Sequence, residues 1–305
     1  MTKVLIAGGT GLVGKHFSKK LIEKGYDIAI LSRTTKNENT LPTYHWNLEK
    51  NEIEKEAIQW ADFIINLAGE NIGEKRWTEK RKQQIIDSRV KAGELLFNTT
   101  KEQNKKLKAY ISASAIGYYG AATSTKIFTE TDNSATDFLG KTCDKWEKVT
   151  DKFTTLGIRT VKIRTGVVLT KEGGALSKMI TPIKIWMGSA LGTGKQYLPW
   201  IHINDLCGIY IKAIEDLKME GAYNAVAPEH VTNNKFYKTI AFVLKKPLWL
   251  PHIPSFIMKL IFGEMSKMLL TGSSVSSAKI KAAGYNFQFA TLKNALVDLL
   301  MPISL

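Results

Sequence analysis

Cysteine, arginine and long apolar runs are scarce in this chain of 305 residues. Two cysteines, Cys143 and Cys207, cannot build a disulfide framework, and no Cys/His spacing resembles a zinc site. No apolar stretch reaches the roughly 18–20 residues that cross a bilayer. A signal peptide is not expected, because Gly8 and Gly9 interrupt the first apolar run. These absences predict a cytoplasmic protein in a reducing compartment, with no metal site.

The nearest approach to a membrane segment is Leu248–Phe262, which Pro251, Pro254 and Lys259 interrupt. We expect this stretch to be a helix packed on the domain. A helix lying in a membrane interface is the alternative. The sequence therefore predicts no membrane partner.

Positive charge is abundant, but arginine contributes little of it. Lys and Arg total 43 against 28 Asp and Glu, a net charge of +15, yet only six of the 43 are arginine. The lysines are scattered, whereas nucleic-acid modules more often cluster arginine among exposed aromatic residues. We expect a solvated lysine surface, no nucleic-acid partner, a small-molecule substrate of unknown identity, and a monomer or homodimer.

Short apolar runs alternate with helical patterns in the first half of the chain. Continuous apolar strands separated by helices are typical of a parallel sheet that is covered on both faces. The sequence thus predicts an α/β fold with a Rossmann-like, doubly wound sheet. The expected strands are Val4–Ala7, Ile28–Leu31, Phe63–Leu67, Ala109–Ser112 and Thr160–Ile163, and the helices are Leu12–Lys24, Thr78–Asn104 and Phe138–Leu156.

The pattern changes after about residue 166. Loops are expected at Gly173-Gly174 and Gly188–Gly194, followed by a helix over Asp205–Leu217 and a strand over Ala222–Val226. From Val231 onward the pattern is mostly helical. We therefore predict a dinucleotide-binding domain over residues 1–230, with some substrate-lobe segments within 170–230. A small helical C-terminal domain over 231–305 would close over the carboxyl ends of the strands.

A glycine-rich stretch directly follows the first expected strand and opens the first helix. Gly8, Gly11 and Gly14 have GxxGxxG spacing, which suits a tight turn, close approach of a pyrophosphate and close helix–strand packing, respectively. The helix amino terminus offers unpaired N–H groups to phosphates. This context predicts dinucleotide binding through the loop residues Gly8, Thr10, Gly11, Leu12, Val13 and Gly14.

The end of the second strand indicates which dinucleotide binds. An acidic residue there would bind ribose hydroxyls, but the sequence has Ser32, Arg33, Thr34 and Thr35, and no carboxylate before Glu38. Hydroxyls and a guanidinium suit a 2′-phosphate, which favours NADP over NAD. A solvated arginine at a strand end is the alternative.

Several motifs resemble those of a known family. Asn66–Gly69, together with the glycine loop and Trp200–Asp205, is similar to motifs of the extended short-chain dehydrogenases/reductases, the branch of the nucleoside-diphosphate-sugar epimerases. Finer matches resemble an atypical epimerase-like subgroup with a C-terminal domain of unknown function. They are Ala68–Ile72, Arg76–Thr78, Asp87–Arg89, Thr165–Leu169, Gly192–Gln196, Ala227–Glu229, Gly263–Met265 and Ala283–Tyr285.

The resemblance implies an NADP site and assigns residues to it. Besides the glycine loop, it includes Ser32, Arg33, Leu67, Ala68, Gly69, Arg89 and Arg164. Arginine suits planar, bidentate binding of a phosphate or a carboxamide. A structural ion pair is the alternative for both Arg89 and Arg164.

The family's catalytic dyad is missing. Family oxidoreductases use a Tyr followed by Lys four residues later, and no tyrosine of this chain has that neighbour. Leu139 and Cys143 align with the two positions, and Cys143 is expected to be a buried structural thiol. Ser114 resembles the family's carbonyl-polarising serine, and Tyr118 resembles a substrate-contacting tyrosine. Either Tyr118 or Tyr119 could act as a weak general acid, with substrate contact or packing as the alternative.

Two smaller assignments and one choice of function follow. Glu70 would bind substrate or accept amide hydrogens, and His202 would cap the helix that begins near Asn204. The leading hypothesis is an NADP-binding, epimerase-like oxidoreductase of an unidentified small polar substrate, with Ser114 and Tyr118 near the reacting oxygen. The alternative is a non-catalytic NADP-binding sensor or protein-interaction module, which the missing dyad favours.

Overall fold

A parallel sheet forms the centre of the protein. The computed structural model describes residues 1–34 and 41–301. Its main sheet has eight strands in the order β11-β8-β6-β5-β1-β2-β3-β4, all parallel to their neighbours except β4, which is antiparallel to β3. The strands are β1 (Lys3–Ala7), β2 (Asp27–Ser32), β3 (Thr43–Asn47), β4 (Glu52–Ile53), β5 (Phe63–Asn66), β6 (Ala109–Ala115), β8 (Thr160–Thr165) and β11 (Gly221–Ala225).

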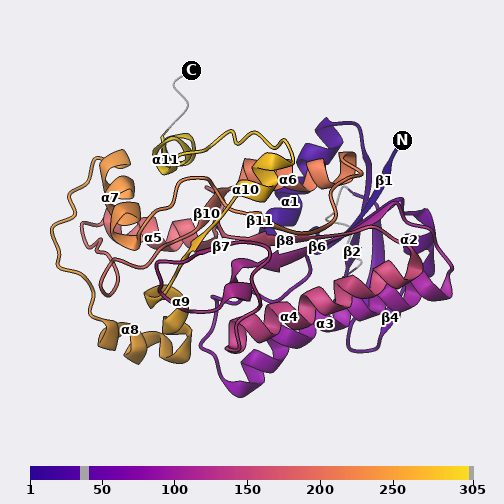
Figure 1. Ribbon diagram of the computed structural model, residues 1–305, viewed down its shortest axis with the longest axis horizontal. Helices are drawn as coiled ribbons and strands as arrows, with labels where there is room; N and C mark the ends of the chain where they lie inside the picture. The colour runs from indigo at the N-terminus through magenta and orange to yellow at the C-terminus, as the bar shows by residue number, and fades with distance from the viewer. Residues whose placement is uncertain (35–40, 302–305) are drawn as a thin grey trace.

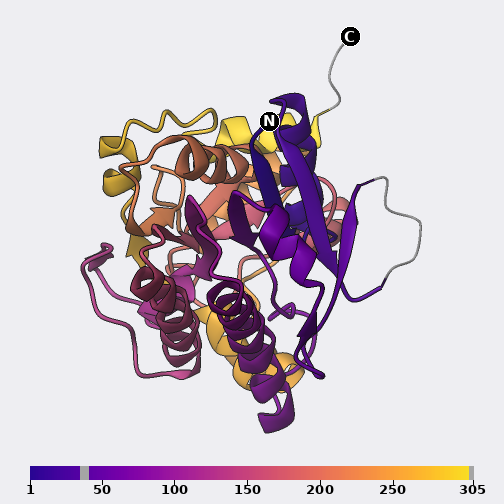
Figure 2. The same cartoon turned by 90° about the vertical axis from the view of Figure 1, so that its right-hand side faces the viewer.

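Helices cover both faces of this sheet, as Figure 1 shows and as the edge-on view of Figure 2 confirms. On one face lie α1 (Leu12–Glu23), α6 (Ile203–Glu215) and α10 (Ala278–Ala282). On the other lie α2 (Lys55–Trp60), α3 (Glu79–Glu102), α4 (Phe138–Lys152) and the 3₁₀ turn η2 (Phe153–Leu156). This arrangement confirms the predicted Rossmann-like, doubly wound fold.

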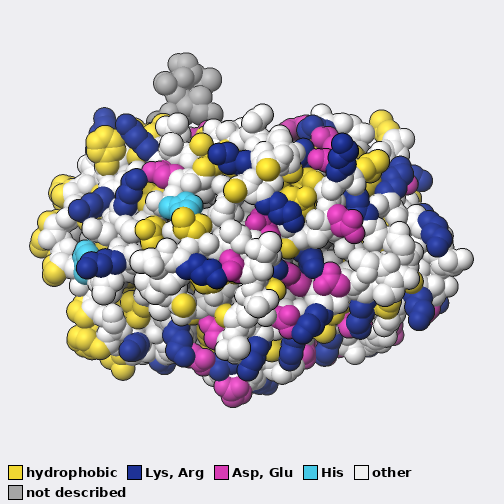
Figure 3. Space-filling model, viewed as in Figure 1, with side chains coloured by type: hydrophobic (Ala, Val, Ile, Leu, Met, Phe, Trp, Pro, Cys, Tyr) yellow, Lys and Arg dark blue, Asp and Glu magenta, His cyan; other side chains and the backbone are white. Residues whose placement is uncertain are grey.

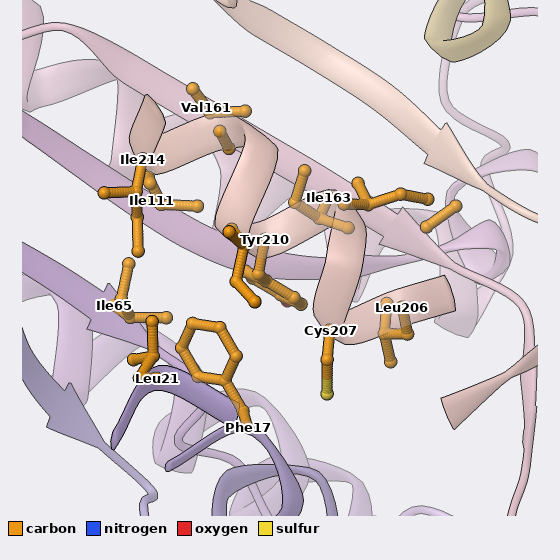
Figure 4. Packing of buried hydrophobic residues seen from close by; sticks show 14 of the residues in the cluster. Phe17, Leu21, Ile65, Ile111, Val161, Ile163, Leu206, Cys207, Tyr210 and Ile214 are labelled. Atoms are coloured by element: carbon orange, nitrogen blue, oxygen red, sulfur yellow. The ribbon is translucent and has the colours of Figure 1, made fainter. Parts of the chain in front are cut away.

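Alternate residues of each strand enter different cores. Ile6 and Ile65 face α1 and α6, where the rings of Phe17 and Tyr210 meet with centroids 5.5 Å apart (Figure 4). Leu5, the neighbour of Ile6 on β1, points to the opposite face and belongs to the core under α2 and α3. Because both faces of the sheet are buried, the strands are continuous apolar runs rather than alternating ones.

The second half of the chain forms a lobe with its own core. The lobe contains β9 (Val167–Leu169), α5 (Gly174–Lys184), β10 (Trp200–His202), α7 (Asn233–Val243), α8 (Ser255–Phe262), η3 (Gly263–Met265), α9 (Ser266–Leu270) and α11 (Leu292–Leu300). A two-stranded sheet of β7 (Ile127–Phe128) and β12 (Ser274–Val275) links the two halves. The buried side chains of the lobe come from α5, α7 and α11, and from Trp200 of β10. Segments on both sides of residue 230 therefore share one core, and the boundary predicted at 230/231 stays a prediction.

The structure adds elements that the sequence analysis did not predict. Strand β3 (Thr43–Asn47) is mostly polar and half-buried, because it lies near the sheet edge. Helix α5 (Gly174–Lys184) lies between the loops expected at Gly173-Gly174 and Gly188–Gly194, in a stretch for which no helix was predicted. The helical pattern expected after Val231 includes α11 (Leu292–Leu300), the last helix of the described residues. In the described residues no helix has both the length and the apolar character to cross a bilayer.

Candidate cofactor and catalytic site

The glycine loop lies where β1 ends, against the end of the neighbouring β5. Gly8 has φ of +79°, and a Cβ on it would lie 2.8 Å from the carbonyl carbon of Leu67 and 2.9 Å from the amide nitrogen of Ala68. A Cβ on Gly14 would collide with the carbonyl oxygen of Gly8. Both positions therefore require glycine on steric grounds. The predicted residues of the loop and of the β5 end are in direct contact.

The amino terminus of α1 has no side-chain cap. Its N-cap is Gly11, whose own N–H donates to the carbonyl oxygen of Gly8 at 3.1 Å. The first N–H groups of a helix have no acceptor within the helix. Leu12 and Val13 thus offer their backbone N–H groups at the positive end of the helix dipole, and Thr10 is exposed beside them. Such an end suits a phosphate.

The end of β2 presents a buried hydroxyl and an exposed guanidinium. The Ser32 Oγ accepts a hydrogen bond from the backbone N–H of Thr34 at 3.2 Å. Arg33 is exposed, and no carboxylate within residues 1–34 and 41–301 forms an ion pair with it. Thr35 and Glu38, which entered the choice of dinucleotide, lie outside the described residues.

The chain after β5 is held in place by side-chain hydrogen bonds. The Asn66 Oδ1 accepts from the backbone N–H of Ala68 at 3.1 Å, and the Asn66 Nδ2 donates to the Tyr110 hydroxyl at 2.8 Å. Both side chains are buried. The backbone of Leu67, Ala68 and Gly69 is thereby fixed beside the glycine loop.

Arg89 of α3 also holds the chain after β5 in place, through hydrogen bonds to backbone oxygens. It donates to the carbonyl oxygens of Glu70 at 3.0 Å and Ile85 at 2.9 Å, and its guanidinium lies 5.0 Å from the Trp146 ring centroid. Burial lowers the pKa of Arg89. The carboxylate of Glu70 pairs with Arg81 at 3.0 Å, and substrate binding by Glu70 stays a prediction. Arg89 contacts backbone oxygens rather than a carboxylate.

Ser114, Glu147 and Arg164 form a buried network between β6, α4 and β8. Ser114 and Arg164 are register partners on adjacent strands. The Arg164 guanidinium donates from Nε and Nη2 to the two Glu147 oxygens, at 2.8 Å each, and the Ser114 hydroxyl donates to Glu147 Oε1 at 2.7 Å. Burial alone would lower the pKa of Arg164, but the Glu147 carboxylate raises it. This is the structural ion pair that was the alternative for Arg164, and its geometry argues against a direct phosphate contact.

Two tyrosines of the 3₁₀ turn η1 (Ile116–Tyr119) adjoin this network. The Tyr118 ring centroid lies 3.5 Å from the Arg164 guanidinium carbon. The Tyr119 hydroxyl accepts from Arg164 Nη1 at 3.0 Å and donates to Asn224 Oδ1 at 2.7 Å. Burial raises the pKa of Tyr119 to about 12. Tyr118 is half-buried. The structure thus brings together Ser114, Tyr118 and Arg164.

The two dyad positions on α4 face the same turn. A Cβ on Gly117 would lie 3.4 Å from the Cβ of Leu139 and 3.6 Å from the Sγ of Cys143. Both side chains are buried, and burial, reinforced by Glu147, raises the pKa of Cys143 to about 12. The buried thiol expected at Cys143 is confirmed. No group able to exchange a proton at neutral pH stands at either position.

Sequence analysis missed Glu147 and Arg81 as site residues, whereas Tyr119 had been named as an alternative general acid. Only the i, i+4, i+8 spacing of Leu139, Cys143 and Glu147 on one helix face could have indicated that Glu147 enters the site. His202, by contrast, was placed correctly, because its Nδ1 accepts from the backbone N–H of Asn204 at 3.1 Å and caps α6.

Comparisons with known proteins agree with this geometry. Residues 4–143 match the NAD dependent epimerase/dehydratase family, and residues 253–299 match a domain of unknown function, DUF1731. The epimerase family protein YfhF of Bacillus subtilis (strain 168) is 38% identical over 301 residues, covering 97% of each chain.

Two solved structures extend the likeness to nearly the whole chain. The human epimerase family protein SDR39U1 (isoform 2), solved with NADPH, is 30% identical with a TM-score of 0.86, covering 98% of this chain and 99% of that one. A nucleoside-diphosphate sugar epimerase from Corynebacterium glutamicum is 28% identical with a TM-score of 0.78, covering 98% of this chain and 58% of that one. The chain belongs to the NAD-dependent epimerase/dehydratase family and carries its DUF1731 region at the C-terminus.

Proposed function

We propose that the chain binds NADP(H) and acts as an epimerase-like oxidoreductase on a small polar substrate. The observation that carries the proposal is the uncapped start of α1 beneath a loop in which Gly8 and Gly14 leave no room for a side chain. The human relative solved with NADPH supports the same cofactor. The residues present fit a dinucleotide, since they supply N–H groups, a guanidinium and close backbone approach.

Each part of the site has a separate task in binding. The N–H groups of Leu12 and Val13 would hold the pyrophosphate, and Arg33 with the Ser32 hydroxyl would hold the 2′-phosphate. The backbone of Leu67–Gly69, fixed by Asn66, would line the adenosine side of the crevice. Arg89 acts one step away, because it anchors the chain after Gly69 rather than reaching the crevice.

Proton transfer has fewer candidates than binding. A bound NADP(H) supplies hydride chemistry. The Ser114 proton is held by Glu147, so in this arrangement the Ser114 oxygen accepts rather than donates. Tyr118 is the remaining hydroxyl of the predicted pair. Its ring is held on the Arg164 guanidinium, which would orient the hydroxyl toward a substrate oxygen at the end of β6.

The 2′-phosphate assignment has a direct test. Arg33→Glu should weaken NADPH binding roughly 10- to 100-fold, because a charge-assisted contact is replaced by repulsion, and it should change NADH binding much less. Lys19→Glu, the same charge reversal on an exposed position of α1, is the matched control. Titration calorimetry with both cofactors measures the ratio. Equal losses for NADPH and NADH would remove the 2′-phosphate from the assignment.

The second candidate, a non-catalytic NADP-binding sensor, rests on one observation. Leu139 and Cys143 occupy the dyad positions, and the Ser114 proton is already bound. Absorbance of NADPH in the presence of carbonyl compounds and nucleotide sugars separates the candidates. Turnover that is reduced at least tenfold in Tyr118→Phe, with unchanged NADPH affinity, supports the enzyme. Tight NADPH binding without turnover across a broad panel supports the sensor.

A further inference from the structure

An exposed apolar surface occupies the C-terminal lobe, outside the cofactor site. Six large side chains on it are between 53% and 75% exposed. Isolated exposed apolar residues are ordinary, but a contiguous group of this size marks a contact surface. We name this group the lobe patch, and its members are Ile185, Trp186, Met187, Trp249, Phe256 and Leu260.

Backbone contacts place the segments of the lobe patch side by side. The N–H of Ile253 donates to the carbonyl oxygen of Ala190, and the N–H of Gly192 donates to the carbonyl oxygen of Ile253, at 2.9 Å each. The Lys246 ammonium, near Trp249 in sequence, lies 4.9 Å from the Trp186 ring centroid. The chain after α5 therefore runs against the chain before α8.

Helix α8 turns its apolar side outward. Phe256 and Leu260 are one turn apart and exposed, whereas Met258 is buried against the lobe. Figure 1 places α8 at a lower corner of the molecule, and Figure 3 shows hydrophobic atoms gathered there with lysines around them. A helix at a corner of the molecule, with its apolar residues directed outward, can insert these residues into a contact surface while the neighbouring elements stay in place.

The charge around the lobe patch has one sign. Residues 173–204 and 230–263 contain no Asp or Glu, while they contain three and five lysines, respectively. Lys184, Lys245 and Lys259 are exposed within these stretches. Of these eight lysines, Lys235 is paired with Glu229, and the other seven form no ion pair with a carboxylate of the described residues. A surface of this kind attracts an anionic partner.

We propose that the lobe patch docks the protein on the surface of an anionic lipid bilayer. Tryptophan rings favour the headgroup region, where the ring is apolar and the N–H is hydrated. Lysine stems cover apolar surface while their ammonium groups reach anionic headgroups. The two tryptophans, the outward face of α8 and the surrounding lysines supply these groups together.

A second copy of the chain fits the lobe patch less well. A two-fold contact would bring the same acid-free surface of both copies together, so that lysines would face lysines. This inference concerns a surface and not the cofactor crevice, so it does not depend on the proposed function. It replaces the sequence expectation of no membrane partner with the alternative that Leu248–Phe262 left open.

Sedimentation with vesicles tests the proposal on the full chain. Vesicles of phosphatidylcholine with about one third phosphatidylglycerol should bind the protein, and vesicles of phosphatidylcholine alone should bind it at least tenfold less. Salt should weaken binding, because the screening length falls from about 10 Å at 0.1 M to about 3 Å at 1 M. Tryptophan emission should shift to the blue on binding. Absence of binding to the anionic vesicles overturns the proposal.

Matched variants locate the contact. Phe256→Ser with Leu260→Ser should reduce binding at least tenfold, whereas Ile22→Ser with Leu217→Ser, two exposed apolar residues of the α/β domain, should not. Lys246→Gln with Lys259→Gln should cost roughly 20- to 30-fold, at about fivefold per lysine. A cooperative urea transition with the wild-type midpoint shows that each variant is folded.

Two further results would overturn the proposal. The first assigns vesicle binding to another surface, and the second assigns the lobe patch to a second copy of the chain. Vesicle binding that is equal in the wild type and in the Phe256/Leu260 variant overturns the proposal, because another surface then makes the contact. Dimers in light scattering that disappear in this variant, without vesicle binding by the wild type, assign the lobe patch to a second copy.

Discussion

Replacing Gly8 by alanine isolates the contact on which the cofactor loop depends. Gly8 and Gly25 both have φ near +80°, so alanine meets the same backbone strain at either position. They differ in surroundings. A Cβ on Gly25 meets nothing within 4 Å, whereas a Cβ on Gly8 meets three backbone atoms of Leu67 and Ala68 within 2.9 Å. Gly25→Ala is therefore the matched control for Gly8→Ala.

The difference between the two variants can be worked from these contacts. The left-handed conformation costs an alanine about 1–2 kcal/mol at either site. At Gly8 the overlap adds roughly 1–3 kcal/mol, because Leu67 cannot yield without displacing the end of a central strand. We expect Gly8→Ala to lower the free energy of unfolding by that additional amount. Displacement of the loop should also cost at least one phosphate hydrogen bond, which is roughly 10- to 100-fold in NADPH affinity.

Urea unfolding and NADPH titration of the two variants measure these effects. Gly25→Ala should keep the wild-type affinity for NADPH, since it lies at the other end of α1. Equal losses of unfolding free energy, with NADPH affinity intact in both variants, would refute the reasoning. In that case the approach of Gly8 to Leu67 would not constrain the loop.

Two further variants test the buried groups. Glu147→Gln should lower the free energy of unfolding by roughly 3–5 kcal/mol, because it leaves the Arg164 charge buried without its partner. Adding Arg164→Met should recover part of this loss. A cost of Glu147→Gln below about 1 kcal/mol in urea unfolding would contradict the prediction. Burial lowers the pKa of His202 from 6.5, and the charge of Asp298 opposes this shift in part. As the pH falls, the unfolded chain is therefore protonated at His202 before the folded chain. Stability is lost as the pH falls below about 6.5. His202→Asn keeps an acceptor for the helix cap and removes the titrating group. The difference in stability between about pH 7.5 and about pH 5.5, measured by urea midpoints, should therefore be smaller in this variant. An unchanged difference would mean that other groups cause the pH dependence.

The parts of the protein that backbone geometry determines were predictable from sequence. Glycine at positions 8, 11 and 14, between an apolar strand and an amphipathic helix, leaves few other structures possible. Buried strands with no polar face indicate a parallel sheet, but they do not show which strand pairs with which. The order of the strands could be inferred only from the resemblance of the motifs to those of the family. Helix α5 escaped prediction because two glycines at its start and Pro182 near its end concealed eleven helical residues.

Side-chain pairing across elements was much less predictable. Arg164 stands at the end of β8, where a phosphate ligand was expected, and its real partner lies 17 residues earlier on α4. Sequence spacing fixes the helix face that Glu147 shares with Cys143, but not the strand against which that face packs. A buried charge needs a partner, and a single sequence cannot distinguish a partner within the protein from one on a ligand.

Dinucleotide binding and proton transfer depend on different parts of the site around the end of β6. Dinucleotide binding depends on the backbone of the glycine loop and of Leu67–Gly69, and none of it requires Tyr or Lys on α4. Proton transfer depends on the side chains at two α4 positions, and these are Leu139 and Cys143. The cation beside the remaining hydroxyl of Tyr118 belongs to Arg164, whose charge Glu147 already neutralises. In the proposed enzyme Tyr118 is the hydroxyl of the predicted pair that Glu147 does not hold, so Tyr118→Phe is the variant on which the enzyme hypothesis depends.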